Sequence, residues 1–146
     1  MKKAKKWRLS GIPAWALSIL TLVATIICFI IPSDLDMKRE LAGQSSIYIG
    51  HFKLQEMIYF IVFFIITPII VFLICRAHPK SIWYAPVICN AVGFGICCVV
   101  IVDSIYSPGD VTLLDWIIWG GSSVLTVTGA IIGARIGRHR IDNTSK

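Results

Sequence analysis

Apolar residues fill four long stretches of the chain, and none of these stretches carries Asp, Glu, Lys or Arg. They are Ile12–Ile31, Met57–Cys75, Ile82–Val102 and Trp116–Ala134. A helix of about 20 apolar residues crosses the roughly 30 Å hydrocarbon core of a bilayer. The pattern therefore predicts an all-α membrane protein, a bundle of four transmembrane helices with spans at about 12–31, 57–75, 82–102 and 113–136.

The segments that connect these stretches differ in charge. The N-terminus, the second connection and the C-terminus together hold eleven of the 14 lysines and arginines, but only Asp142 among the 8 acids. The first and third connections hold the other seven acids. Because positively charged segments stay on the cytoplasmic side, both termini are expected in the cytoplasm of a plasma-membrane protein. The first connection, Ser33–Glu56, is then a longer outward loop.

Composition indicates a single transmembrane domain over residues 1–146. The chain is 56% hydrophobic, against about 45–50% for a soluble protein, and its longest connection is too short to bury a core. The net charge of +6 lies at membrane ends. We therefore expect contact with anionic membrane lipid and no nucleic-acid binding. The first stretch is longer than the ~7–15-residue core of a secretory signal, which favours a retained span.

Local signals predict where helices end or bend. Pro32 and the polar residues after it predict the end of the first span, and Gly43 predicts the end of a short helix that follows. Pro68 predicts a kink in the second span. The apolar segment Ile47–Leu54 is too short to span, and it shows neither a clear strand period nor a clear helix period.

Small residues recur along the last stretch at helical spacing. Gly129, Gly133 and Gly137 follow one another every fourth residue, with Ala130 and Ala134 beside them. Two Gly-x-x-x-Gly steps allow the backbone of another helix to approach closely. The pattern predicts a close helix contact, either within one chain or between two chains.

Polar residues inside the stretches form a second candidate group. They are Asn90, Ser18, Thr21, Thr25 and Thr126. Intramembrane polar residues can mark a substrate path. A single neutral amide more often forms a hydrogen bond between helices, worth roughly 0.6–2 kcal/mol. We expect such a bond from Asn90 to Ser18, Thr21, Thr67 or Thr126.

Acidic residues gather in the outward connections and form the third group, an outer acidic rim. They are Glu56, Asp103, Asp110 and Asp115. The favoured interpretation is a solvated rim. The alternative is that Glu56, Asp103 and Asp115 converge on a divalent cation, since hard cations prefer carboxylate oxygens. The spacing matches no ligand motif, and we assign no metal or cofactor.

No stretch holds an ionisable residue of the kind that proton-coupled pumps and intramembrane hydrolases use. The first-span glutamate of small multidrug exporters and the polar motifs of fluoride channels are also absent. We therefore expect a non-enzymatic accessory, regulatory or immunity-type subunit that acts through helix–helix association, with a membrane-protein partner or with itself. The alternative is a homo-oligomeric channel or transporter for a small solute. A third possibility, a lipid enzyme, would require the outer acids and His51 to form a site.

Overall fold

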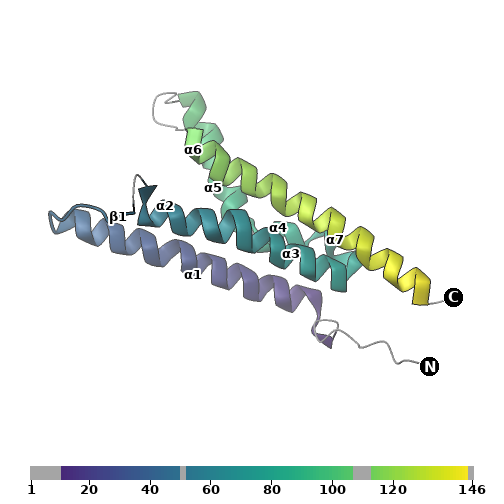
Figure 1. Ribbon diagram of the computed structural model, residues 1–146. Coiled ribbons are helices and arrows are strands. Elements are labelled where there is room, and N and C mark those ends of the chain that lie inside the picture. Colours follow the sequence, from purple (N-terminus) through teal and green to yellow (C-terminus); the bar gives the residue numbers. More distant parts are fainter. Residues whose placement is uncertain (1–10, 50–51, 107–112, 145–146) are drawn as a thin grey trace.

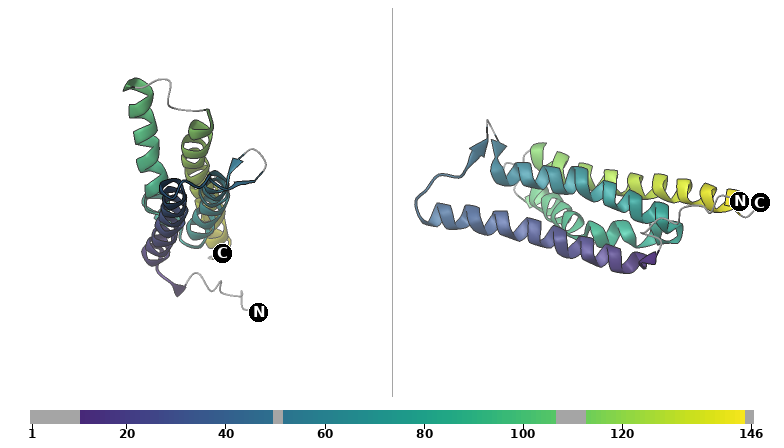
Figure 2. Two further views of the ribbon diagram at one scale, coloured as in Figure 1. Left: turned by 90° about the vertical axis from the view of Figure 1, so that its left-hand side faces the viewer. Right: turned by 60° about the horizontal axis from the view of Figure 1, so that its bottom comes forward.

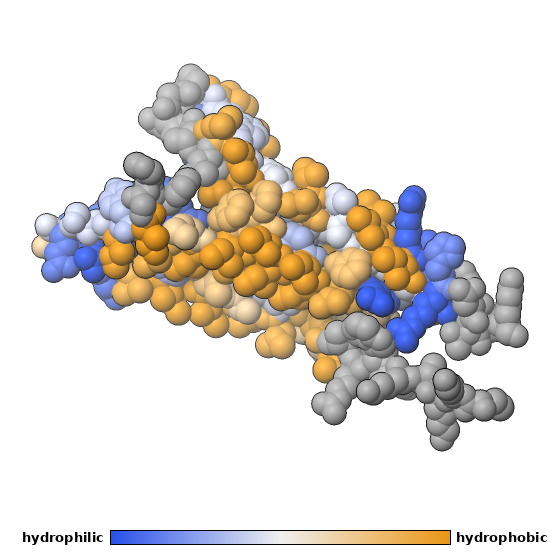
Figure 3. All heavy atoms as spheres, viewed as in Figure 1, coloured by the Kyte–Doolittle hydropathy of each residue, from blue (hydrophilic) through white to orange (hydrophobic). Residues whose placement is uncertain are grey.

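The protein is an elongated bundle of helices with one short hairpin (Figure 1). The computed structural model describes residues 11–49, 52–106 and 113–144. Three helices are long and apolar enough to cross a membrane: Ala14–Leu41, Leu54–Ala77 and Trp116–Ile141. Hydrophobic residues cover the middle of the molecule on the face seen in Figure 3, and hydrophilic residues gather toward its ends. These features are those of an all-α membrane protein.

Helix α1 runs from Ala14 to Leu41 and contains Pro32. The predicted break between the first span and a separate short helix is wrong, because α1 is continuous through Pro32. The hydroxyl of Ser33 donates to the carbonyl oxygen of Phe29 at 2.9 Å, and the hydroxyl of Tyr59 donates to the same oxygen at 3.1 Å. These bonds supply polar partners to the turn that the proline disturbs, so the helix continues beyond it.

The end of α1 follows the predicted signal. Gly43 has a φ of 70°, a left-handed conformation that glycine adopts without a steric penalty. Its N–H donates to Glu40 O at 3.0 Å, and Gln44 N–H donates to Arg39 O at 2.9 Å. This pair of bonds is the Schellman pattern that closes many helices.

The segment whose period was unclear forms a β-hairpin. Strand β1 (Tyr48–Ile49) pairs antiparallel with strand β2 (Phe52–Lys53). Leu54 N–H also donates to Ile47 O at 2.8 Å, which extends the pairing by one bond. The hairpin leads directly into the next helix.

The second helical segment consists of α2 (Leu54–Tyr59), the π-helical η2 (Phe60–Ile66) and α3 (Thr67–Ala77). Pro68 lacks the N–H that would continue an α-helical ladder. The wider turn precedes it, and the Thr67 hydroxyl donates to Val62 O at 2.9 Å. The helix therefore has a π-helical stretch before the proline, at the place where the sequence predicts a kink.

The third apolar stretch is not one helix. It contains the 3₁₀ turn η3 (Pro79–Trp83), α4 (Ala85–Cys89) and α5 (Ala91–Tyr106), and the break lies at Asn90. Asn90 has φ −112° and ψ 25°, outside the α-helical region. The predicted uninterrupted helix at 82–102 is wrong. Helix α5 leans away from the rest of the bundle (Figure 2).

The last segment joins α6 (Leu113–Asp115), the π-helical η4 (Trp116–Gly121) and α7 (Ser122–Thr144). Helix α7 lies along α3 (Figure 1), and its C-terminal end lies at the same end of the bundle as the start of α1. Helices α3 and α7 form the most extensive packing of the bundle.

Two apolar clusters occupy opposite ends of the core. The inner cluster, near the start of α1, contains mostly small and aliphatic residues: Ala14, Val71, Ile74, Cys75, Ala85, Cys89, Ala130 and Ala134. The outer cluster is aromatic-rich and contains Tyr59, Phe63, Val100, Ile118 and Trp119, with Phe29 packed against it. The buried polar residues other than Ser81 lie between these two clusters along the chain.

Candidate functional site

A buried polar layer separates the two apolar clusters. Its members are Ser18, Thr21 and Thr25 of α1, Thr67 of α3, Asn90, and Ser122, Ser123 and Thr126 of α7; none is more than 8% exposed. In each of the four helical segments that contribute to it, this layer lies between the residues of the inner cluster and those of the outer cluster. The sequence singled out five of these residues, and the structure buries all five.

None of the seven hydroxyls of the polar layer donates a hydrogen bond to another helical segment. Each donates to a backbone carbonyl of its own helical segment, at 2.7 to 3.1 Å. Such bonds let Ser and Thr lie inside an apolar helix without an unmet donor. The hydroxyl oxygens keep lone pairs, so the layer presents acceptors rather than donors.

Asn90 is the exception within the polar layer. The side chain is fully buried, and neither Oδ1 nor Nδ2 has a hydrogen-bond partner in the described part of the chain. The expected bond from Asn90 to another helix is therefore not formed. The side chain instead folds over Gly93, where an added Cβ would overlap Oδ1. A buried amide without partners costs roughly 1–3 kcal/mol.

The glycine face of α7 packs inside the chain. A Cβ at Gly129 would lie 3.0 Å from the Pro68 carbonyl oxygen, and one at Gly137 would lie 2.6 Å from the Arg76 carbonyl oxygen. A Cβ at Gly133 would overlap a carbonyl oxygen of the same helix, α3. The sequence left open whether this contact is within one chain or between two chains, and the structure places it within one chain. This face is consequently covered and offers no surface to a partner.

The two alanines predicted beside these glycines are also buried. Ala130 is fully buried and Ala134 is 2% exposed, and both belong to the inner cluster. Small side chains at such positions allow neighbouring helices to lie close together.

The outer acids are dispersed rather than gathered. Glu56 accepts a bond from Lys53 N–H at 3.3 Å and so caps the start of α2. Asp103 is exposed on α5, and Asp115 lies at the end of α6. Asp110 and His51 lie outside the described residues. No group of three His, Cys, Asp or Glu residues within the described ranges is placed to hold a metal ion, so the alternative of a cation site formed by Glu56, Asp103 and Asp115 is not seen there.

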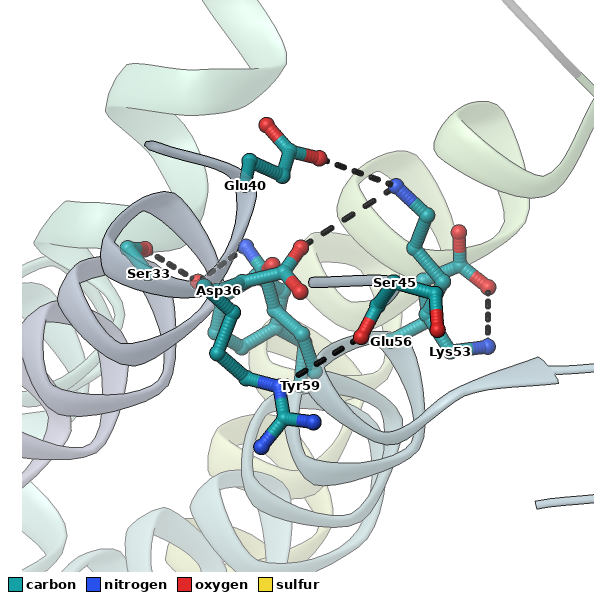
Figure 4. A network of polar contacts seen from close by, with 9 residues as sticks. Ser33, Asp36, Glu40, Ser45, Lys53, Glu56 and Tyr59 are labelled. Atoms are coloured by element: carbon teal, nitrogen blue, oxygen red, sulfur yellow. Dashed lines mark hydrogen bonds and ion pairs between the residues drawn. The ribbon is translucent and has the colours of Figure 1, made fainter. Parts of the chain in front are cut away.

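A polar network that the sequence did not predict lies beside the hairpin (Figure 4). The Nζ of Lys53 lies 4.0 Å from carboxylate oxygens of both Asp36 and Glu40. Lys38 pairs with Asp34 at 2.6 Å along the same helix. The two pairs of Lys53 connect the outer extension of α1 to the hairpin, but the exposure of these ion pairs limits each to about 0–1 kcal/mol.

Tyr59 is the centre of the buried side of this network. Its hydroxyl contacts the Ser33 hydroxyl, accepts a bond from Gln55 Nε2 at 2.9 Å and donates to Phe29 O. Its ring stacks on Phe29 with 5.2 Å between centroids and also contacts Trp119. A sequence signal existed, because a glycine such as Gly50 is the residue preferred at the first position of one type of two-residue hairpin connection. A hairpin there returns the chain toward α1.

One side of α5 carries small residues that nothing covers in the described part of the chain. Ala91, Gly95, Cys98 and Val102 share this side by their spacing, and all four are exposed. A Cβ added at Gly95 meets no atom within 4 Å. Only Gly93 and Val100 of this helix are buried. We name the four exposed residues the α5 face.

Comparison of the chain with protein-family models, with curated proteins and with solved structures gives no match.

Proposed function

We propose that the chain is a four-span protein of the plasma membrane, in which α4 and α5 together form the third span and both termini face the cytoplasm. The start of α1 and the end of α7 lie at one end of the bundle, as this topology requires. Arg135, Arg138 and Arg140 lie at that end of α7, which fits the positive-inside rule. A reporter that is active only in the cytoplasm should therefore be active when it is fused to either terminus.

Within this topology, the protein acts as a non-enzymatic accessory, regulatory or immunity-type subunit that binds another membrane protein. The observation that supports this role is the α5 face. Its Ala91 and Gly95 are spaced as a small-x-x-x-small pair, which permits close approach of a second helix in lipid. The equivalent pattern on α7 is already used against α3. Among the described residues, the α5 face is thus a small-residue surface that remains open to a partner.

Site-specific photocrosslinking tests this role. A photoreactive amino acid at Val102, on the α5 face, should give an adduct with another membrane protein in native membranes. The same amino acid at Val23, on the exposed side of α1, should not. The replacement Gly95→Leu should remove the adduct, because the added side chain projects from the face and holds a second helix away. Adducts of equal yield at both positions would contradict the role.

The matched control is Ala24→Leu. Ala24 is also a small, exposed residue within a span, so the same substitution adds the same bulk on the surface of α1. It should leave the adduct at Val102 intact. If both leucine variants lose the adduct, the loss reflects general damage to the bundle, and the α5 face has no particular role.

A second candidate function, a homo-oligomeric channel or transporter for a small solute, is supported by Asn90. The residue combines a helix break, complete burial and an unpaired amide inside a polar layer. Broken helices with polar groups near the membrane midplane are typical of transporter sites. Solute flux into liposomes that contain the purified protein, lost in Asn90→Leu while the protein stays folded, would favour this function over the accessory role.

A further inference from the structure

A groove of about 130 Å³ lies between the outer extension of α1, the hairpin and the start of α2. Aliphatic side chains form most of its wall: Ile31, Leu35, Ile47, Leu54 and Ile58, with Pro32 beside them. The polar residues that line it are Asp36, Arg39 and Gln55. The groove is therefore apolar along its length and carries one positive and one negative side chain.

The groove lies at the depth where α1 leaves the hydrocarbon layer. At about 1.5 Å per residue, Ile31 is about 26 Å along the helix from Ala14, close to the thickness of a 30 Å hydrocarbon core. Arg39, two turns further on, reaches the headgroup region. Ile31 and Leu35 are 54% and 56% exposed although they line the groove, so its wall is continuous with the lipid-facing side of α1.

The charges around the groove leave one cation without a carboxylate. Asp36 and Glu40 both face Lys53 at 4.0 Å, and Asp34 pairs with Lys38. Arg39 forms no ion pair with the described residues; its Nε donates to the Ser45 carbonyl oxygen at 3.4 Å. That bond leaves the two terminal nitrogens of the guanidinium to bind an anion.

We propose that this groove binds a phospholipid of the adjacent leaflet, with the upper part of one acyl chain along the aliphatic wall and the phosphate on Arg39. A guanidinium matches phosphate oxygens with two parallel hydrogen bonds, and its weak hydration suits the membrane interface. The volume holds only about four groups of the size of a water molecule. The groove thus accepts a short length of chain and not a whole lipid, whose remainder stays in the bilayer.

The proposal is tested in vesicles of equal parts phosphatidylethanolamine and phosphatidylglycerol that contain the full-length protein. A trace of phosphatidylethanolamine with a diazirine in the acyl chain, near the glycerol, serves as the probe. After illumination, mass spectrometry maps the labelled residues. Labelling should concentrate on Leu35, Leu54 and Ile58 and exceed that of Ile27, which faces lipid elsewhere on α1.

Arg39→Gln should lower labelling of the groove by about tenfold, since a charge-assisted bond of about 1.4 kcal/mol corresponds to that factor. Lys38→Gln is the matched control: Lys38 is the adjacent base, more exposed and not part of the groove, and its loss should change nothing. Ile58→Trp fills the groove while keeping Arg39, and it should also abolish the labelling there.

Thermal unfolding of each variant shows whether the fold is intact, and Ile58→Trp provides the test if Arg39→Gln does not fold. Even labelling along all lipid-facing residues would overturn the proposal. Equal labelling of the groove in the wild type and in a folded Arg39→Gln or Ile58→Trp variant would overturn it as well. If millimolar inorganic phosphate binds in an Arg39-dependent way and leaves the labelling of the groove unchanged, Arg39 binds a free anion, and that result would also contradict the lipid.

Discussion

The packing of α7 on α3 predicts a large effect for the smallest possible change at Gly133. In Gly133→Ala, the new methyl group would overlap the carbonyl oxygen of Phe72 and lie 3.2 Å from the Arg76 nitrogen. Both atoms belong to the backbone of α3, so no side chain can rotate away. The two helices must therefore separate by about 1 Å, and overpacking of this kind costs about 1–3 kcal/mol.

The net effect follows from two opposing terms. Alanine stabilises a helix interior by roughly 0.5–1 kcal/mol relative to glycine. Because the overlap is with backbone, the upper part of the overpacking range applies, and we expect Gly133→Ala to lower the free energy of unfolding by about 2 kcal/mol. That loss changes the folded-to-unfolded ratio by roughly thirtyfold.

Reversible unfolding in mild detergent, followed by steric trapping or by circular dichroism, measures this loss. Gly95→Ala is the matched control, because a Cβ there meets nothing within 4 Å. It should leave stability unchanged or slightly increased. If Gly133→Ala is as stable as Gly95→Ala, α7 does not pack on α3 as described, and the glycine face would be free for a partner after all.

Three further variants test other parts of the fold by the same unfolding measurement. Asn90→Leu should not lower stability, since it removes an amide that has no partner; a clear loss would reveal a bond from that amide. Gly93→Ala should destabilise by displacing the Asn90 side chain, and the added change Asn90→Ala should restore much of the loss; purely additive effects would contradict this contact. Tyr59→Phe should cost about 1–2 kcal/mol through its bonds to Gln55 and Phe29; an unchanged midpoint would show that those bonds contribute nothing.

Much of the architecture was predictable because long apolar stretches have few alternatives to helices in a membrane. The helix end at Gly43, the π-helical stretch before Pro68 and the hydrogen bonding of the α1 hydroxyls all follow from local chemistry. Each depends on one residue type with one dominant preference: a positive φ, a missing N–H, or a hydroxyl that bonds its own helix.

Where the structure differs from the sequence predictions, the cause is a contact between residues far apart in the chain. Pro32 predicted a helix end, yet Tyr59, from another helix, donates to the disturbed turn and the helix continues. Asn90 predicted a bond between helices, yet candidate hydroxyls donate to their own backbone, and Gly93 leaves space for the amide to fold back. No pattern within a single segment contains this information.

The glycines of α7 also show that a pattern within one segment does not identify the segment that it contacts. Their spacing predicts a close helix contact without saying with which helix, and only the placement of α3 shows that these glycines pack inside the chain. Gly95 forms a single small-x-x-x-small step with Ala91, a shorter pattern than the two glycine steps of α7. The structure gives it importance by leaving its side of α5 uncovered in the described part of the chain.

The most direct test of the account is the mass of the complex that carries the protein out of its native membrane in mild detergent, compared between wild type and Gly95→Leu. The account predicts a complex of wild type with another membrane protein in fixed stoichiometry, and its loss in Gly95→Leu while Ala24→Leu retains it. A wild-type protein that emerges alone, or as a homo-oligomer with nothing else bound, would contradict the accessory role.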